Sequence, residues 1–355
     1  MSDSDWLLYG ATGYTGHCIA AEAAHRALRP ILAGRNAATV RALAEKLGLD
    51  KRVFDLSEAA TIRRSIRGAM LVLNCAGPFS ATAGPLMTAC LAERVHYLDI
   101  TGEIDVIESA VALDQEAKIA GVTLLPAVGF DVVPSDCLAA KLAEKLPDAS
   151  RLQLAISGTA SVSAGTAKSM LDALGHGGRV RIDGQIRRAP LAWKSREVPF
   201  RDGSRLAMTI PWGDVASAYY STRIPNIEVY AAASARQIAV LRQWRWLLPV
   251  LGVRPLPTLA KWVIDRRFHG PSAESRDRET ASLWGRAEDQ HGKSVEATLT
   301  TPNGYSLTIM TALGAVERML KSAPRVGFLT PSLAFGADFI KSFRGCDFRL
   351  GVANE

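Results

Sequence analysis

The stretch Trp6-Leu-Leu-Tyr9-Gly10-Ala11-Thr12-Gly13-Tyr14-Thr15-Gly16 places three glycines between a short apolar run and an Ala-rich stretch. An apolar run followed by a helical pattern indicates a strand, a turn and a helix. In such a unit a dinucleotide pyrophosphate meets backbone N–H groups and the positive end of the helix. We therefore predict that residues 10–16 form the pyrophosphate loop of a dinucleotide-binding domain.

The glycine spacing is GxxGxxG rather than the more familiar GxGxxG. We expect Gly10 to permit the tight turn, Gly13 to let the backbone approach a phosphate, and Gly16 to let the helix pack close to the strand. Turns between strands and helices favour glycine in general, so the surrounding strand–turn–helix context carries this prediction.

Further short apolar runs follow, each separated from the next by a helical pattern. The expected strands are residues 30–33, 52–54, 69–74, 95–98 and 122–125. Buried runs that alternate with helices are typical of a parallel sheet covered on both faces. The predicted fold class is α/β, with a Rossmann doubly wound parallel sheet in the first third of the chain.

The second expected strand ends in Gly34-Arg35. NAD-binding domains usually carry Asp or Glu here to hold the ribose 2′-hydroxyl, whereas a guanidinium suits a 2′-phosphate. We predict NADP(H) as the cofactor and Arg35 as the contact; an ordinary solvated arginine is the alternative. Asp55, after the third strand, is expected near the adenine or, alternatively, in the N-cap region of the next helix.

Polar clusters also follow the later strands, at the edge where a doubly wound sheet binds its ligand. Ala76-Gly77-Pro78-Phe79 is expected to frame the nicotinamide half of the cofactor. Asp99–Glu103 and Gly129–Asp136 follow the next two strands, and Asp131 is our candidate catalytic group beside the nicotinamide. Turns and helix caps use the same residue types, so each cluster has a structural alternative.

After Pro147 the pattern changes to that of a mostly antiparallel sheet with a few helices. Asp183-Gly184 predicts a hairpin turn, and Pro302-Asn-Gly304 predicts a second one. The expected strands are residues 151–156, 179–187 (a hairpin), 205–210, 227–233, 295–301 and 305–311, and the expected helices are 165–174 and 312–321. The predicted domains are residues 1–135 for NADP binding and 136–321 as an inserted α+β substrate or dimerisation domain, with 322–355 packing back on the first.

Two segments of the second domain have open interpretations. Residues 161–168 form a small polar loop that either closes over the nicotinamide or simply caps a helix. Residues 237–270 interleave Trp, Leu and Arg. Such a helical pair can lie in a membrane interface or cover an apolar substrate channel. Alternatively, it can pack on its own sheet or on the second subunit of a dimer.

The composition limits the function classes. The 355 residues are 48% apolar and 22% charged, which is typical of a globular protein of about two domains. The formal charge of +7 is not gathered in a nucleic-acid-binding motif, so we expect no nucleic-acid partner. Five widely spaced cysteines without a CxxC pair predict reduced thiols and no metal site. With no signal peptide or spanning stretch, we expect a cytoplasmic protein, with peripheral membrane association as an alternative.

Several motifs together resemble the saccharopine dehydrogenase-like family, closest to its bacterial trans-acting enoyl reductases and saccharopine dehydrogenase-like oxidoreductases. In the first part of the chain they are GATGYTG at 10–16, AGR at 33–35, GPF at 77–79, HYLDITGE at 96–103 and GFDVVPSD at 129–136. Later pieces are residues 211–214, 224–226, 301–305 and 330–338. The resemblance implies a Rossmann domain that binds NADP(H), an inserted α+β domain and, often, a homodimer.

The first hypothesis is therefore an NADP(H)-dependent oxidoreductase that transfers a hydride to or from a C=C (enoyl or acyl) or C=N bond of a small or lipid-like substrate. One alternative is a saccharopine reductase of lysine metabolism. Another is a non-catalytic nucleotide-binding scaffold at a membrane surface. An ordinary short-chain reductase would carry a Tyr-x-x-x-Lys pair, which this sequence lacks.

Overall fold

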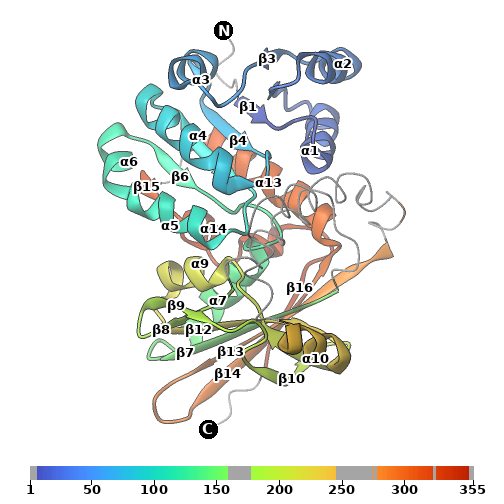
Figure 1. The fold of residues 1–355 in the computed structure, drawn as a ribbon, viewed down its shortest axis with the longest axis vertical. Coiled ribbons are helices and arrows are strands. Elements are labelled where there is room, and N and C mark those ends of the chain that lie inside the picture. Colours follow the sequence, from blue (N-terminus) through green and yellow to red (C-terminus); the bar gives the residue numbers. More distant parts are fainter. Residues whose placement is uncertain (1–5, 159–176, 245–273, 275–277, 323–324, 352–355) are drawn as a thin grey trace.

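A parallel sheet of seven strands organises the first part of the chain in the computed structural model (Figure 1). The structure describes residues 6–158, 177–244, 274, 278–322 and 325–351. The strand order is β15-β6-β5-β4-β1-β2-β3. The strands are β1 (Trp6–Tyr9), β2 (Ile31–Gly34), β3 (Lys51–Val53), β4 (Leu71–Asn74), β5 (His96–Asp99), β6 (Thr123–Leu125) and β15 (Gly327–Phe328). The predicted doubly wound parallel sheet is confirmed.

Helices cover both faces of this sheet, and every residue of β1, β2 and β4 is buried. Leu7 and Leu8 of β1 point to opposite faces and belong to two different buried clusters. Ile19 of α1 lies in the Leu8 cluster, and Leu86 of α4 lies in the Leu7 cluster. The helices are α1 (Tyr14–His25), α2 (Ala37–Leu47), α3 (Ala59–Ile66), α4 (Phe79–Glu93), α5 (Ile104–Ala112), α6 (Asp114–Ala120) and α13 (Gly304–Lys321).

The second sheet is mixed and mostly antiparallel, in the order β10-β11-β12-β7-β13-β14-β16, with β8 and β9 attached through β12. Only the β12–β7 pair is parallel among its described ladders. The strands are β7 (Arg151–Ser157), β8 (Gly178–Ile182), β9 (Gln185–Ala189), β10 (Ser195–Phe200), β11 (Gly203–Thr209), β12 (Asn226–Ala232), β13 (Thr280–Glu288), β14 (Ser294–Pro302) and β16 (Asp347–Leu350).

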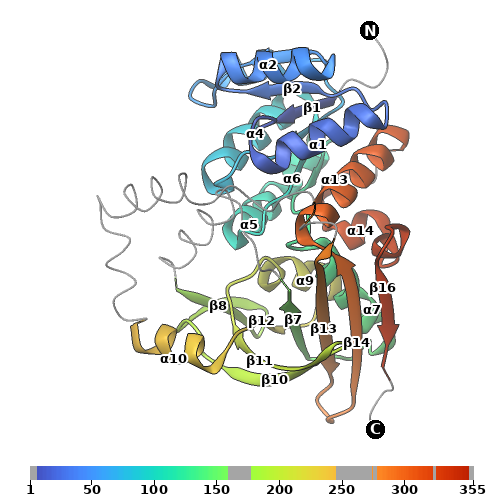
Figure 2. The ribbon, with the colours of Figure 1, turned by 90° about the vertical axis from the view of Figure 1, so that its right-hand side faces the viewer.

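Helices α7 (Val133–Lys145) and α9 (Asp214–Thr222) lie between the two sheets and cover the inner face of the second one (Figure 2). Leu152 and Leu154 of β7 point to that face and join the cluster that also contains Leu8 of β1. Helix α10 (Ala235–Trp244) lies beside β10, while α14 (Pro331–Phe335) and the short 3₁₀ helix η2 (Phe339–Ser342) pack on α7.

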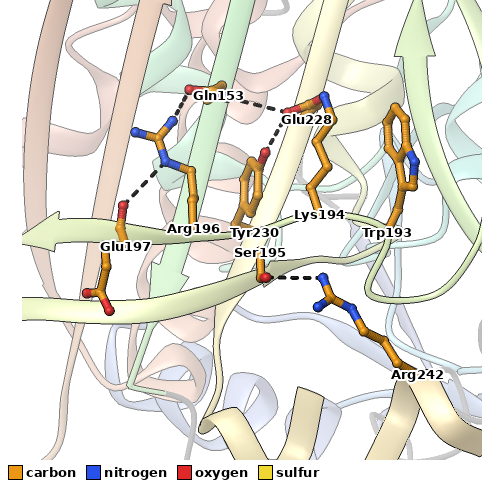
Figure 3. Close-up of a pocket in the computed structure, with 9 residues that line it drawn as sticks. All are labelled: Gln153, Trp193, Lys194, Ser195, Arg196, Glu197, Glu228, Tyr230 and Arg242. Carbon is orange, nitrogen blue, oxygen red and sulfur yellow. Dashed lines mark hydrogen bonds and ion pairs between the residues drawn. The ribbon is translucent and has the colours of Figure 1, made fainter. Parts of the chain in front are cut away.

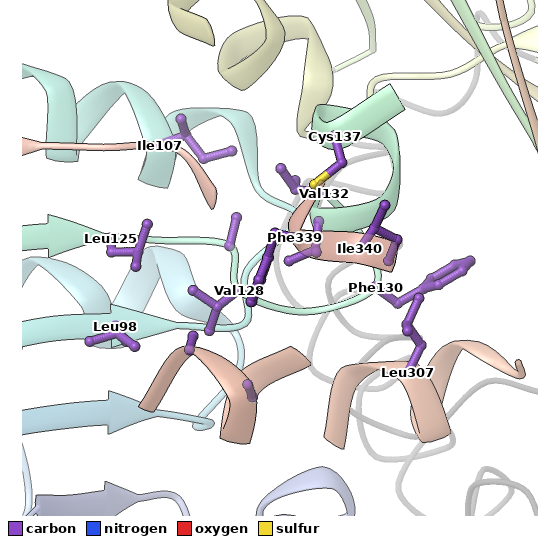
Figure 4. Close-up of a cluster of buried hydrophobic side chains, with 14 of the residues drawn as sticks. Leu98, Ile107, Leu125, Val128, Phe130, Val132, Cys137, Leu307, Phe339 and Ile340 are labelled. Carbon is purple, nitrogen blue, oxygen red and sulfur yellow. The ribbon is translucent and has the colours of Figure 1, made fainter. Parts of the chain in front are cut away.

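One continuous core joins the two parts of the chain. Figure 4 shows Leu98 and Leu125 of the first sheet in the same cluster as Cys137 of α7 and Phe339 of η2. The C-terminal part of the chain adds a strand to each sheet, because β15 pairs with β6 and β16 pairs with β14. The division of the chain at residues 135 and 321 stays a prediction.

One expected hairpin is confirmed and the other is wrong. Strands β8 and β9 pair around Asp183 and Gly184, whose φ angles of 49° and 75° suit a tight hairpin turn. Residues 305–311, in contrast, are helical and not a strand. The side chain of Asn303 accepts a hydrogen bond from the Tyr305 N–H, so this residue is the N-cap of α13 rather than part of a hairpin turn.

Some predictions lie outside the described residues. The expected helix at 165–174, the loop at 161–168 and most of the segment 237–270 belong to this group. The described part of the chain contains no helix that is both long and apolar enough to span a membrane.

Candidate functional site

The glycine loop has the close backbone contacts that its spacing predicts. Gly10 has a φ of +79°, and a Cβ atom there would lie 2.7 Å from the backbone nitrogen of Ala76. A Cβ atom on Gly16 would lie 2.2 Å from the carbonyl oxygen of Gly10. The first glycine therefore lets β1 approach the loop after β4, and the third lets α1 pack directly on the loop.

The N-terminus of α1 has no side-chain cap. Its N-cap residue is Gly13, so no side chain caps the first N–H groups. Thr12 and Gly13 are exposed, Tyr14 and Thr15 are partly buried, and Ala11 is fully buried beneath them. An exposed helix start with a glycine cap fits a pyrophosphate, which is the geometry that a dinucleotide cofactor requires.

Arg35 directly follows β2 at the same edge of the sheet. Its side chain is exposed, and no hydrogen bond or ion pair joins its guanidinium to another described residue. Within the described chain the guanidinium is thus available to an external anion. Asn36 takes the role of N-cap of α2, because its side chain accepts the N–H of Thr39 at 3.1 Å.

Asp55 and Arg35 both lie close enough to Tyr9 for their charges to act on its hydroxyl. The pKa of Tyr9 is raised, mainly by burial and next by the charge of Asp55, whereas the charge of Arg35 lowers it. Asp55 accepts hydrogen bonds from the backbone N–H and the hydroxyl of Ser57, and these bonds lower its own pKa. Its carboxylate therefore shapes the turn before α3, where Glu58 is the N-cap. The contact of Asp55 with an adenine stays a prediction.

The loop Ala76–Phe79 is held by Glu103, the N-cap residue of α5. The Glu103 carboxylate accepts the N–H of Phe79 at 2.9 Å and the N–H of Ser80 at 2.7 Å. These two groups are the first donors of α4, so this helix already has an anion at its positive end. Sequence reasoning placed Glu103 in a polar cluster but missed this role, because the contact spans 24 residues along the chain.

A buried polar network fixes the loops at the ends of β4, β5 and β6. Asn74 donates to the hydroxyl of Tyr97, which in turn donates to Asp99. The other oxygen of Asp99 accepts the N–H groups of Thr101 and Ala127. Burial raises the pKa of Asp99 to about 6. Since these groups are saturated by one another, the network serves to hold the site rather than to react.

Asp131 lies in the loop between β6 and α7, at the carboxyl edge of the first sheet and facing the second domain. Its side chain is partly buried and packs against Gly102, where a Cβ atom would lie 2.7 Å from Oδ2. No described residue hydrogen bonds to its carboxyl group. Burial and then the charge of Glu103 raise its pKa to about 7. Asp131 is thus an available carboxyl group that titrates near neutrality.

The far face of the second sheet carries a separate cavity of about 610 Å³ (Figure 3). Its polar side chains pair with one another. Arg196 donates to Gln153, Tyr230 donates to Glu228, and Arg242 donates to Ser195. The cavity contains none of the predicted site residues. We therefore place the candidate site at the carboxyl edge of the first sheet. No cluster of potential metal ligands occurs among the residues that the structure describes.

Comparison with known proteins assigns the first domain. Residues 6–125 match the family model described as the saccharopine dehydrogenase NADP binding domain. A protein named trans-acting enoyl reductase from Mycobacterium ulcerans (strain Agy99) is 34% identical over 138 residues, which cover 37% of this chain and 33% of that protein. Its namesake from Mycobacterium tuberculosis (strain ATCC 25618 / H37Rv) is 33% identical over 140 residues, which cover 37% of this chain and 34% of that protein. The match spans about a third of these curated relatives' length.

The whole chain has the fold of a known enzyme structure. Apo saccharopine dehydrogenase (L-Glu forming) from Saccharomyces cerevisiae matches with a TM-score of 0.65 over 98% of this chain and 100% of that chain, at 12% identity. That likeness confirms the predicted combination of a Rossmann-type sheet and a second, mostly antiparallel sheet. The resemblance drawn from the motifs is confirmed as well, since residues 6–125 match the model of the saccharopine dehydrogenase NADP binding domain.

Proposed function

We propose that this protein is an NADP(H)-dependent oxidoreductase that reduces a C=C bond of an uncharged acyl substrate, with Asp131 as the proton donor. The observation that carries the proposal is the placement of Asp131. It is an available carboxyl group with a pKa of about 7, at the sheet edge where a Rossmann domain binds its cofactor.

The cofactor assignment rests on two features of the first domain. The N–H groups at the start of α1, which Gly13 leaves without a side-chain cap, suit the pyrophosphate. The exposed guanidinium of Arg35 at the end of β2 suits the 2′-phosphate. Both features agree with a family whose domain binds NADP.

The chemistry requires a hydride and a proton on neighbouring carbons. NADPH supplies the hydride when it is bound. Asp131 supplies the proton to the adjacent carbon and is left as a carboxylate, which regains its proton from water. A pKa of about 7 suits this role, because the group is still protonated at neutral pH and releases its proton without a large energetic cost.

The charges around Asp131 support an uncharged substrate. Glu103 raises the pKa of Asp131, and no described Lys or Arg lowers it. An acidic surrounding of this kind repels the carboxylates of a saccharopine-like substrate. The alternative of a saccharopine reductase is therefore the weaker one. The names of the mycobacterial relatives agree with an enoyl substrate.

The test is NADPH consumption with a panel of 2-enoyl thioesters, compared with the glutamate and aldehyde pair of a saccharopine reductase. We expect turnover of an enoyl thioester. Asp131→Asn should reduce kcat about 10²- to 10⁴-fold, the range of a lost general acid, and leave NADPH binding unchanged. Asp105→Asn is a matched control, because Asp105 on α5 forms an ion pair with Arg179 on β8. Full turnover by Asp131→Asn would remove Asp131 from the mechanism.

The scaffold alternative has one structural feature in its favour. Val240 and Trp244 on α10 are 50% and 51% exposed, which gives this helix an apolar outer side. Flotation of the protein with anionic liposomes, run beside the turnover assay, separates the two functions. Flotation without turnover would favour the scaffold. Homodimer formation and a cytoplasmic location stay predictions.

A further inference from the structure

Three loops meet around Asp131, and one of them belongs to the second domain. The loop Thr101–Glu103 follows β5, the loop Gly129–Val132 lies between β6 and α7, and the turn Pro211–Gly213 precedes α9. A Cβ atom on Gly213 would lie 2.8 Å from Cγ2 of Val132 and 3.2 Å from the carbonyl oxygen of Gly102. The turn is therefore in direct contact with both loops of the first sheet.

Side-chain hydrogen bonds tie the turn and α9 to the loop that carries Asp131. The indole Nε1 of Trp212 donates to the backbone carbonyl of Asp131 itself. The hydroxyl of Ser135 donates to Oδ2 of Asp214 at 2.8 Å. About two turns later on α9, the Ser221 hydroxyl donates to Asp136. The contacts fall on Asp131 itself and on residues that follow it at the start of α7, so they restrain its backbone from the second sheet's side.

Asp214 is fully buried, and its Oδ1 has no hydrogen-bond partner within the described chain. Ser217, three residues later on the same helix, also has a buried hydroxyl without a described partner. An ionised carboxylate in this position would be costly. Burial, with the charges of Asp136 and Asp131, raises the pKa of Asp214 far above its usual range. A neutral Asp214 can hold Ser135 without adding a charge beside Asp131.

We propose that Trp212 and Asp214 are positioning residues by which the second domain fixes the carboxyl group of Asp131 in the site. The function of Asp131 rests on the proposed reductase activity, but its placement does not. The titratable groups facing Asp131 are Glu103 from the β5 loop, Asp214 from α9 and, through Asp214, Asp136 from α7. Loosening the turn admits water to these carboxyl groups.

The first experiment needs neither cofactor nor substrate. The pKa of the Asp131 carboxyl is measured on the full chain by ¹³C NMR with labelled aspartate, and Asp131→Asn identifies its signal. Trp212→Phe removes the indole donor but keeps an aromatic ring. We expect the pKa to fall from about 7 by at least about one pH unit, because the freed loop becomes better hydrated. Trp193→Phe, on the cavity side of the second sheet, is the matched control and should leave the pKa unchanged.

Ser135→Ala removes the hydrogen bond between Ser135 and Asp214 with a smaller change in side-chain volume. This variant tests the proposal if Trp212→Phe does not fold. We expect a fall in the same direction, because Asp214 then no longer holds the loop. An unchanged pKa of Asp131 in the folded variants would overturn the proposal.

Turnover provides an independent readout once a substrate is known. Trp212→Phe should lower kcat in the wild-type background and have no further effect in the Asp131→Asn background. An equal loss in both backgrounds would show a merely structural role and contradict the proposal. If no substrate is turned over but the Asp131 pKa responds to Trp212→Phe, the positioning proposal stands and the proposed function fails.

Discussion

Helices α1 and α4 both begin at the carboxyl edge of the first sheet, but only one of them has an internal anion at its start. The first N–H groups of α4 donate to the carboxylate of Glu103. At α1 the N-cap is Gly13, and no side chain takes that place. Both helices follow a buried central strand, so the difference lies in the loops rather than in the sheet.

This difference separates a binding position from a structural one. The positive end of α4 is neutralised from within the protein by Glu103, which also fixes the loop Ala76–Phe79. The positive end of α1 remains for an external anion, which the proposed function identifies as the pyrophosphate of NADP(H). Substitutions at the start of α1, compared with substitutions in α4, test this difference.

The largest effect is expected for Gly16→Ala in α1. The new Cβ atom would lie 2.2 Å from the carbonyl oxygen of Gly10, so the loop has to move. We expect NADPH affinity to fall by more than about 100-fold, since displacing a binding loop by an ångström is enough to cost that much. Fluorescence titration with NADPH measures the effect.

Gly84→Ala in α4 is its matched control, because a Cβ atom at this helical position meets nothing within 4 Å. This variant should bind NADPH normally and be more stable by about 0.5–1 kcal/mol, the gain expected for alanine over glycine in a helix. If both variants bind NADPH as the wild type does, α1 is not the pyrophosphate site.

An intermediate effect is expected for Arg35→Ala. Loss of one charge-assisted contact with the 2′-phosphate, worth about 1.5–3 kcal/mol, corresponds to an affinity for NADPH about 10- to 100-fold weaker. NADH lacks this phosphate, so its affinity should hardly change. Calorimetric titration with both cofactors measures the ratio, and a parallel loss for NADPH and NADH would contradict the 2′-phosphate assignment.

The smallest effect is expected for Glu103→Gln, which removes the anion from α4. The helix should lose about 1–2 kcal/mol of stability through its N-terminus. The variant also removes the charge that raises the pKa of Asp131. Asp131 donates only while protonated, so kcat should fall above about pH 7 in the wild type, and this limb should move to lower pH in the variant.

Glu93→Gln, at the opposite end of α4, tests whether that shift is specific. Glu93 pairs with Arg63 and Arg67 rather than with any group of the site. Its loss should leave the pH profile of kcat unchanged. If the pH profile of kcat shifts equally in both variants, the decline of kcat at high pH reflects overall stability and not the ionisation of Asp131.

The first sheet could be predicted because each of its central strands carries its own signal. In β1 and β4 every residue is apolar or lies at the strand end, and glycine or a polar cluster marks the next turn. The second sheet was harder to predict. The inner face of strand β13 carries the small residues Ala281, Gly285 and Ala287 beside Leu283, and Gly285 is small because Leu138 and Leu142 of α7 pack against it. That pattern has little hydrophobic contrast, so the strand was missed.

The site was predictable only where its contacts are local. Gly10 and Gly16 act within seven residues of each other, and the spacing alone predicts their roles. The contact of Glu103 with α4 and that of Trp212 with Asp131 join positions 24 and 81 residues apart. Nothing in the local pattern indicates such pairs. The sequence at residues 302–304 is equally compatible with a hairpin turn and a helix cap, and only the packing of α13 decides between them.

A crystal structure of the protein grown with NADP⁺ tests the central claim most directly. We expect the pyrophosphate at the N–H groups that begin α1, the 2′-phosphate on Arg35, and the nicotinamide ring beside Asp131. We also expect Glu103 to keep its place at the start of α4. A pyrophosphate bound elsewhere, or a nicotinamide ring directed away from Asp131, would contradict the account.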